Sequence, residues 1–447
     1  MKTAEIKIDR TAIAYPVLKT NNLLKENIMP EYKAPGVYVE EIPSAIQAIV
    51  GVSTSTAGFI GIMPDSFQVP QENLLTYKPE LRELIDNEKN NLAEPGEVKL
   101  CTNFSEFKRF FGGFSSDEQH NMLAHAVYGF FNNGGKRCYV VAVREEASIT
   151  VEFLESRFTV IDEIAIVAAP GITNKAVWDS IVTHCQQRTG DRFAIFDSPE
   201  DVVDDDGNLD LIKLNPPTED DDDETNVLPK YSTYAAFYFP WIKVDDPVAK
   251  SQDSNSDGRY VPPSGHLAGI YARTDVDRGV HKAPANEVVI GALGLKYKIS
   301  KNHQEGLNPQ GVNCIRDMNG NIRVWGARTI GGDANGEFKY INVRRVLLYL
   351  RESIEEGTQW AVFEPNDYKL WAKIRRNITA FLTNVWRDGA LFGNTPQEAF
   401  YVKCDEETNP PEVRELGQVI TEIGVAVVRP AEFVIFRITQ WSGEENN

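Results

Sequence analysis

The feature that most limits how this chain can fold is a set of short, uninterrupted apolar runs. They lie at 137–143 (RCYVVAV), 164–169 (IAIVAA) and 193–196 (FAIF). A strand that is apolar along its whole length is buried on both faces, as in parallel sheets. Helical stretches at 117–131 and 176–189 alternate with these runs. The pattern predicts an α/β middle domain with a mostly parallel sheet and helices on both faces.

The last third of the chain predicts a different, α+β domain. Two stretches, 343–356 and 367–387, carry apolar residues at helical spacing, and we expect Gly357 and Gly389 to end these helices. Before them, Asn319-Gly320 predicts the tight turn of a β-hairpin. Three extended runs follow the helices, at 400–404, 419–428 and 432–441.

A length of 447 residues exceeds what one compact core usually organises. We predict an extended N-terminal arm at 1–45, the α/β domain at 46–335 and the C-terminal domain at 336–447. The acidic and polar stretches at 201–225 and 245–259 are predicted to be solvated surface loops.

Charge and composition exclude several classes of function. The formal charge of −19 argues against a nucleic-acid partner, because phosphate binding needs clustered cations. We expect no secretory signal and no membrane insertion, since neither a signal-like start nor a long apolar stretch is seen. Five scattered cysteines predict buried free thiols in a reducing cytoplasm, with a zinc site as the remote alternative.

Patterns that resemble catalytic or ligand sites are incomplete. The Gly134–Arg137 stretch is not a phosphate-binding loop, because Phe130 stands in place of the first glycine and no Ser or Thr follows the lysine. The Ser53 region lacks the final glycine of a nucleophile elbow. An EF-hand-like start at Asp253 has Ser264 where the bidentate glutamate belongs. His266 is predicted to cap or pack a helix start. We therefore predict no catalytic residue, no metal and no cofactor.

Two short strands lie near the ends of the chain, at 34–44 (APGVYVEEIPS) and 429–441 (RPAEFVIFRITQW). Prolines bracket the first strand and a proline begins the second; since proline cannot donate a hydrogen bond to a neighbouring strand, it marks where a strand ends. Such a terminal strand can add to the open edge of a neighbour's sheet, or it can pair within its own chain. The pattern alone favours pairing within the chain.

Several separate blocks of the sequence resemble the phage tail sheath family. PEYKAPGVYVEEIPS followed by TAGFIG is similar to the N-terminal signature of these proteins, and VPPSGHLAGIYARTDVDRGVHKAPANE to their most recognisable internal block. INVRRVLLYLRESI, WRDGALFG, KCDEETNPPE and RPAEFVIFRITQW resemble the C-terminal domain in order. The first thirty residues extend beyond the usual sheath start, which suggests a phage-derived extracellular injection system or a related particle.

The resemblance implies a subunit of stacked hexameric rings around an inner tube protein, with baseplate and terminal cap proteins as further partners. It implies that the subunits assemble in the cytoplasm, into a particle that is released or membrane-anchored. It also implies that the assembled sheath is metastable and that its contraction drives the tube into a target envelope. It also favours exchange of the terminal strands between subunits. The residues that it assigns to exchange are Val37, Tyr38, Val39, Glu40 and Ile42, with Phe433, Val434, Ile435, Phe436 and Ile438.

One basic feature stands out in this acidic chain. Lys369, Lys373 and Arg376 are spaced to share one face of the 367–387 helix, with Arg375 beside them. They form a solvated face or, given the resemblance, a surface that holds an acidic inner tube. Two other classes of function stay open at this point: a tail tube subunit, which should be smaller and mostly β, and a cytoplasmic α/β hydrolase.

Overall fold

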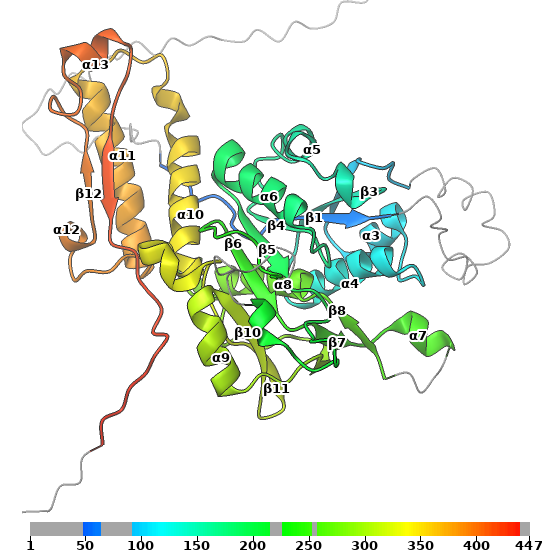
Figure 1. Cartoon of the computed structure of the whole chain (residues 1–447). Helices are drawn as coiled ribbons and strands as arrows, with labels where there is room; N and C mark the ends of the chain where they lie inside the picture. Colours follow the sequence, from blue (N-terminus) through cyan, green and yellow to red (C-terminus); the bar gives the residue numbers. More distant parts are fainter. Residues whose placement is uncertain (1–47, 64–91, 215–225, 253–256, 439–447) are drawn as a thin grey trace, which may run out of the picture. The chain divides into compact units, whose positions relative to one another are not determined.

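The computed structural model describes residues 48–63, 92–214, 226–252 and 257–438, and these contain an eight-stranded sheet. Its strands are β1 (Ala57–Ile62), β2 (Val98–Cys101), β3 (Cys138–Val143), β4 (Ile166–Ala168), β5 (Phe193–Asp197), β6 (Ala235–Phe239), β10 (Val312–Met318) and β11 (Asn321–Val324). The order is β11-β10-β6-β5-β4-β1-β3-β2 (Figure 1). The six inner strands run parallel, and the two edge strands β2 and β11 run antiparallel to their neighbours. The predicted mostly parallel sheet is confirmed.

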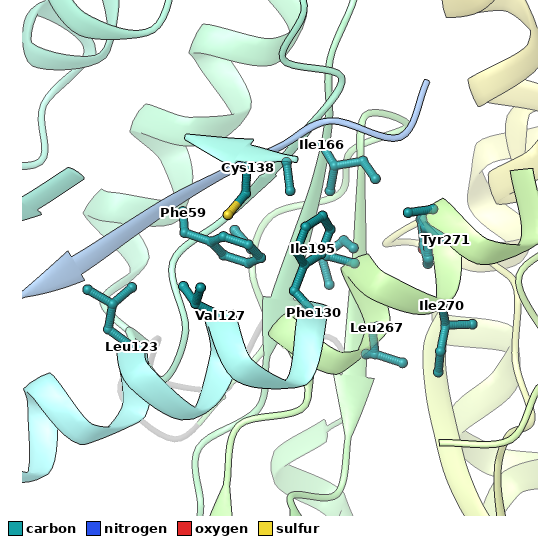
Figure 2. Close-up of a cluster of buried hydrophobic side chains, with 14 of the residues drawn as sticks. Phe59, Leu123, Val127, Phe130, Cys138, Ile166, Ile195, Leu267, Ile270 and Tyr271 are labelled. Atoms are coloured by element: carbon teal, nitrogen blue, oxygen red, sulfur yellow. The ribbon is translucent and has the colours of Figure 1, made fainter. Parts of the chain in front are cut away.

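Helices cover both faces of this sheet. One face, which carries Phe59 and Ile195, packs against α4 (Glu118–Asn132) and α8 (Ser264–Arg278) (Figure 2). The opposite face packs against α5 (Val151–Arg157) and α6 (Lys175–Thr183), with Trp178 fully enclosed. Side chains alternate between the faces along each strand, so both sides of every inner strand are apolar.

The helices α4 and α8 approach each other closely because glycines line their contact. A Cβ at Gly265 would lie 2.3 Å from the Ala126 backbone, and one at Gly269 would lie 2.4 Å from the Phe130 carbonyl oxygen. At Gly129, an added Cβ would meet the His266 ring at 2.3 Å. The glycines of the SGHLAGI stretch therefore set the spacing between two helices.

The remaining elements of this region are shorter. The helices are α3 (Phe104–Phe111), α7 (Pro247–Gln252) and α9 (Lys301–Leu307), with 3-10 turns at η2 (Glu146–Ser148), η4 (Leu211–Leu214), η5 (Asn308–Gln310) and η6 (Gly332–Phe338) and a π-helical turn η3 (His184–Thr189) after α6. Asn319 and Gly320 both have positive φ, as predicted for the hairpin turn between β10 and β11.

The polar stretch at 245–259 is not simply a loop, which corrects our expectation. It contains α7 and leads into a three-stranded antiparallel sheet of β8 (Arg259–Val261), β7 (Ile242–Val244) and β9 (Ala292–Leu295). The buried Asp246 carboxylate accepts hydrogen bonds from Val248 N at 3.0 Å and Arg259 Nε at 3.0 Å. The polar composition of the stretch gave no indication of a helix with a buried capping residue. In the 201–225 stretch, Leu214 is buried at the end of η4, and residues 215–225 lie outside the described residues.

Two long helices dominate the C-terminal part. They are α10 (Ile341–Thr358) and α11 (Tyr368–Arg387), followed by α12 (Pro396–Ala399), β12 (Phe400–Lys403), α13 (Pro411–Glu415) and β13 (Glu422–Val425), with a 3-10 turn η7 (Gln359–Ala361) after α10. The apolar stripe predicted for 367–387 is buried against Val346 and Leu350 of α10. Asp367 caps α11 by accepting from Lys369 N and Leu370 N.

Gly357 does not end α10, contrary to our expectation. It lies inside the last turn, where an added Cβ would meet the side chain of Ile49 at 2.7 Å. This glycine permits close contact between the first described residues and α10. Gly389, with φ of +84°, follows α11 as predicted.

Candidate assembly interface

The segment Phe433–Ile438 exposes a run of large apolar side chains. It forms no helix or strand within the described part of the chain. Phe433, Val434, Ile435, Phe436 and Ile438 are between 68% and 94% exposed. Contiguous apolar surface of this kind marks an interaction site. The strand predicted for 432–441 is thus not paired in the single subunit over its described residues, and 439–441 lie outside them.

Just before this segment, the Glu432 carboxylate is held by a set of converging donors that we call the Glu432 clamp. Its Oε1 accepts from Arg328 Nε at 2.9 Å and from Asn308 Nδ2 at 2.7 Å. Its Oε2 accepts from Arg328 Nη2 at 2.9 Å and from the Tyr340 hydroxyl at 2.9 Å. The carboxylate therefore receives a two-pronged arginine contact plus two further bonds.

The side chain of Arg328, which donates two of the bonds to Glu432, is itself held in place by other residues. Arg328 is buried, and its Nη1 also donates to the Asn308 carbonyl at 3.0 Å and to Asp333 at 3.1 Å. Burial disfavours the charge on Glu432, but the bonds from Arg328, Asn308 and Tyr340 outweigh it and lower the pKa of Glu432. Glu432 therefore stays ionised at neutral pH.

A second potential surface is the two-stranded antiparallel sheet of β12 and β13. Beyond β13, Phe392 N donates to the Ala426 carbonyl at 2.7 Å. On the other side, no strand of the described residues pairs with the outer edge of β12, where Tyr401 is exposed. An unpaired edge offers free backbone donors and acceptors to an added strand.

The four basic residues of α11 do not form one uniform row. Lys369, Arg375 and Arg376 are exposed, and Lys373 is half-buried. Lys373 places its Nζ 3.8 Å from the centre of the Trp360 ring, and Arg375 donates to the Cys404 carbonyl at 3.0 Å. Lys369, Lys373 and Arg376 remain available as a positive surface, whereas Arg375 also fastens α11 to the end of β12.

The N-terminal exchange residues Val37, Tyr38, Val39, Glu40 and Ile42 lie outside the described residues. Their predicted role stays a prediction.

Two residues of the site-like patterns, His266 and Ser264, take structural roles. His266 is fully buried, and burial lowers its pKa to about 3, so it packs as a neutral ring. The Ser264 hydroxyl donates to Asp197 at 2.6 Å, and burial raises the pKa of Asp197 to about 6. The five cysteines are free and buried. Among the described residues, no acidic, histidine and cysteine side chains gather as metal ligands, and no helix has the length and apolar character of a membrane span.

A buried ion pair connects α10 with α8 and with the first described residues. Arg345 Nη1 and Nη2 donate to Asp275 at 2.9 and 2.6 Å, and Nη2 also donates to the Thr54 carbonyl at 2.9 Å. The Thr54 hydroxyl donates to Asp275 at 2.6 Å, and Arg345 lies over the Tyr271 ring. Both charged side chains are at most 4% exposed. Removal of either partner would leave a buried, unpaired charge.

An acidic cleft of about 500 Å³ lies where α10 meets the loops around Asp162 and Asp191. Its carboxylates are Asp162, Asp191, Glu352, Glu355 and Glu356. Burial, and then the negative charges of Asp191, Glu355, Glu356 and Asp162, raise the pKa of Glu352 to about 7.

We expect the Glu352→Gln substitution to make unfolding less dependent on pH. The ordinary pKa of the unfolded group is 4.5, so between pH 4.5 and about 7 the folded state holds a proton that the unfolded state has lost. Native Glu352 therefore destabilises the fold increasingly across this window. At pH 8 the free energy of unfolding of the glutamine variant should exceed that of the wild type by about 1 kcal/mol, after allowance for solvent screening. At pH 5 the two free energies should be nearly equal. Urea unfolding at both pH values checks this; an equal difference at both would contradict it.

Sequence reasoning missed the residues that fasten these elements, namely Glu432, Arg328, Arg345 and Asp275. One signal was present for Arg345. It lies between Ile341 and Leu348 at helical spacing on a buried face, so a charge interrupts an apolar row. Asp275 follows the buried Tyr271 by one turn of α8 in the same way. The clamp had no comparable signal, because its members are separated by up to 124 residues.

The described residues thus combine a parallel-sheet body, an exposed apolar segment and an open strand edge at β12. Comparison with known proteins identifies the family in which this architecture occurs. The family descriptions "Phage tail sheath protein central domain" and "Phage tail sheath C-terminal domain" match residues 151–330 and 333–440. The chain belongs to the phage tail sheath family.

Solved sheath structures resemble nearly the whole chain. The PVC sheath complex of an extracellular contractile injection system, in its contracted state, is 26% identical, with a TM-score of 0.69 over 93% of this chain and 99% of that one. The helical sheath of the anti-feeding prophage, also contracted, is 25% identical, with a TM-score of 0.66 over 92% and 100%.

Phage relatives match over shorter regions. The tail sheath proteins of Vibrio phage KVP40 and Burkholderia phage BcepMu are 28% and 27% identical over 186 and 202 residues. These regions cover 41% and 43% of this chain, and only 26% and 40% of the phage proteins. The chain thus spans less than half the length of these curated relatives.

Proposed function

We propose that this chain is the repeating subunit of a helical contractile sheath, in which strand exchange links stacked hexameric rings. The observation that carries the proposal is the exposed apolar segment Phe433–Ile438, which has no strand partner among the described residues. In an added strand its apolar side chains would point to both faces of a neighbour's sheet, and β12 offers an open edge for such a strand. In the N-terminal arm, Val37, Tyr38, Val39, Glu40 and Ile42 serve as the second exchanged strand.

The sheath acts by changing the packing of its subunits and needs no catalytic chemistry. It assembles in the cytoplasm in a metastable extended state around an inner tube protein, with baseplate and terminal cap proteins at its ends. Contraction repacks the interfaces and releases free energy that drives the tube into a target envelope. The likeness to PVC and anti-feeding prophage sheaths favours an injection particle that is released or membrane-anchored. Neither nucleic acid nor direct membrane insertion is part of this function.

Negative-stain electron microscopy of the purified full-length chain, alone and co-expressed with the tube protein of its own particle, tests the proposal. Striated hollow cylinders are the expected result. Monomers under both conditions, together with hydrolysis of ester or peptide substrates, would instead support an enzyme.

The positive surface of α11 is proposed to face the inner tube. Lys369, Lys373, Arg375 and Arg376 supply cations in a chain of net charge −19, so an acidic tube would be drawn to this helix. Contacts between exposed charges are weak enough to let a tube slide.

We expect charge reversal of Lys369, Lys373 and Arg376 to glutamate to reduce tube co-assembly at least about tenfold at low salt, because attraction becomes repulsion. Co-sedimentation of tube with sheath measures the effect. Reversal of Lys301, an exposed lysine of α9, to glutamate is the matched control. Unchanged co-sedimentation of the triple variant would place the tube elsewhere.

A further inference from the structure

Tension in an exchanged C-terminal strand must enter the folded subunit at a definite place. When two linked subunits move apart, a strand formed by residues 433–438 is pulled from its root. Two routes lead from that root into the fold. One is the Glu432 clamp, and the other is the backbone that runs back through Val428 to β13.

The backbone route consists of hydrogen bonds between uncharged groups. Among the described residues, the four residues of β13 pair with the four residues of β12. The chain between β13 and the clamp is held by bonds from Ala426 N to the Ala399 carbonyl at 2.8 Å, from Phe392 N to the Ala426 carbonyl at 2.7 Å, from Val428 N to the Ala390 carbonyl at 3.1 Å and from Asn342 to the Val428 carbonyl at 3.1 Å. These bonds are spread along the chain, so a pull from the C-terminal end reaches those of Val428 first.

The clamp route is stronger. Four hydrogen bonds converge on one carboxylate and are loaded together, and two of them come from a buried arginine. Bonds between charged partners are about twice as strong as neutral ones. Arg328 precedes η6, and Asn308 follows α9, so both belong to the region that holds the parallel sheet.

We infer that Glu432 and Arg328 form a tension anchor, which passes force from the exchanged strand directly into the α/β body and protects the β12–β13 sheet from peeling. This inference rests on the strand exchange proposed above. Glu432 and Arg328 are therefore positioning residues of the sheath's linkage, distinct from the apolar residues that enter the neighbour.

Single-molecule pulling on the full chain tests the anchor directly. One handle is attached through a Lys301→Cys substitution on the exposed surface of α9, and the other at the C-terminus. The five native cysteines are buried, so they do not compete for the handle. Glu432→Gln keeps the shape but removes the charge, and Arg328→Lys keeps the charge but removes the two-pronged contact. Glu412→Gln, on the exposed surface of α13, is the matched control.

At constant force, both clamp variants should shorten the lifetime of the first rupture about ten- to hundredfold, because charge-assisted bonds are lost. The Glu412→Gln control should behave as the wild type. Equal lifetimes for wild type and Glu432→Gln would overturn the anchor. In assembled cylinders, Glu432→Gln should increase breakage on contraction, and unbroken cylinders would also count against the anchor.

The two proposals fail in different ways. If the wild type forms no cylinders even with its tube, the sheath function and the role of the anchor in it are overturned, whatever the rupture lifetimes. If the wild type forms cylinders but clamp variants match it in lifetime and breakage, only the anchor is overturned.

Discussion

Replacement of Arg345 by methionine is expected to lower the free energy of unfolding by about 3–5 kcal/mol. The guanidinium satisfies the buried Asp275 carboxylate and the Thr54 carbonyl together. Methionine fills similar space but removes the cation that pairs with Asp275. The Asp275 side chain is only 4% exposed, so water cannot replace that cation. Because the pair joins α10, α8 and the first described residues, the loss should affect the whole fold. Urea unfolding of the monomer, followed by circular dichroism, measures the change.

Two further variants separate this ion pair from general damage to α10. Arg351→Met removes an exposed arginine of the same helix, whose Nη1 donates to the Gly190 carbonyl at 3.2 Å, and should cost less than about 1 kcal/mol. Adding Asp275→Asn to Arg345→Met removes the unpaired carboxylate. The double variant should therefore lose less unfolding free energy than the sum of the losses of the two single variants. Additive losses would mean that the two side chains are not energetically coupled.

Deletion of residues 433–447 is expected to abolish cylinder formation and to leave the monomer folded. The five apolar side chains of the described part of this segment are largely exposed in the subunit, so their removal sacrifices little internal packing. In an assembly they would supply both the added strand and its apolar contacts. Electron microscopy scores cylinders, and circular dichroism scores the fold of the monomer.

A point substitution sharpens the same prediction. Phe436→Asp should also prevent assembly, because a charge would enter the neighbour's apolar face. Phe436 is 82% exposed, so the unfolding free energy of the monomer should change by less than about 0.5 kcal/mol. Arg437→Asp, which points to the opposite side of an extended strand, serves as the control and should assemble. Cylinders from the deletion variant would rule out the C-terminal strand as the link.

The central sheet could be predicted because its signal is local. The runs at 137–143 and 193–196 became β3 and β5, since continuous apolar sequence is compatible with few positions other than the inside of a covered sheet. The hairpin at Asn319-Gly320 was equally local, because two positive φ values favour those residues.

The helix α7 and the Glu432 clamp could not be predicted, because they depend on contacts between residues that are separated in the sequence. The helix α7 forms beside a buried carboxylate whose arginine partner lies thirteen residues away, and polar composition conceals such a pairing. The Glu432 clamp joins residues that no spacing rule connects. For 433–438 the sequence predicts a strand, but these residues form no strand in the single subunit. A partner supplied by another chain leaves no signal in the sequence of this one.

The contact between Thr54 and Arg345 has a consequence for how the subunit is made. Its members are 291 residues apart, so the first described residues cannot reach their final place until α10 has left the ribosome. At a synthesis rate of about 5–20 residues per second, this delay lasts from roughly fifteen seconds to a minute. The linking segment at 433–438 is translated later still. Each nascent chain can therefore complete its body before it displays its C-terminal linking strand, so exchange through this strand follows the folding of the body.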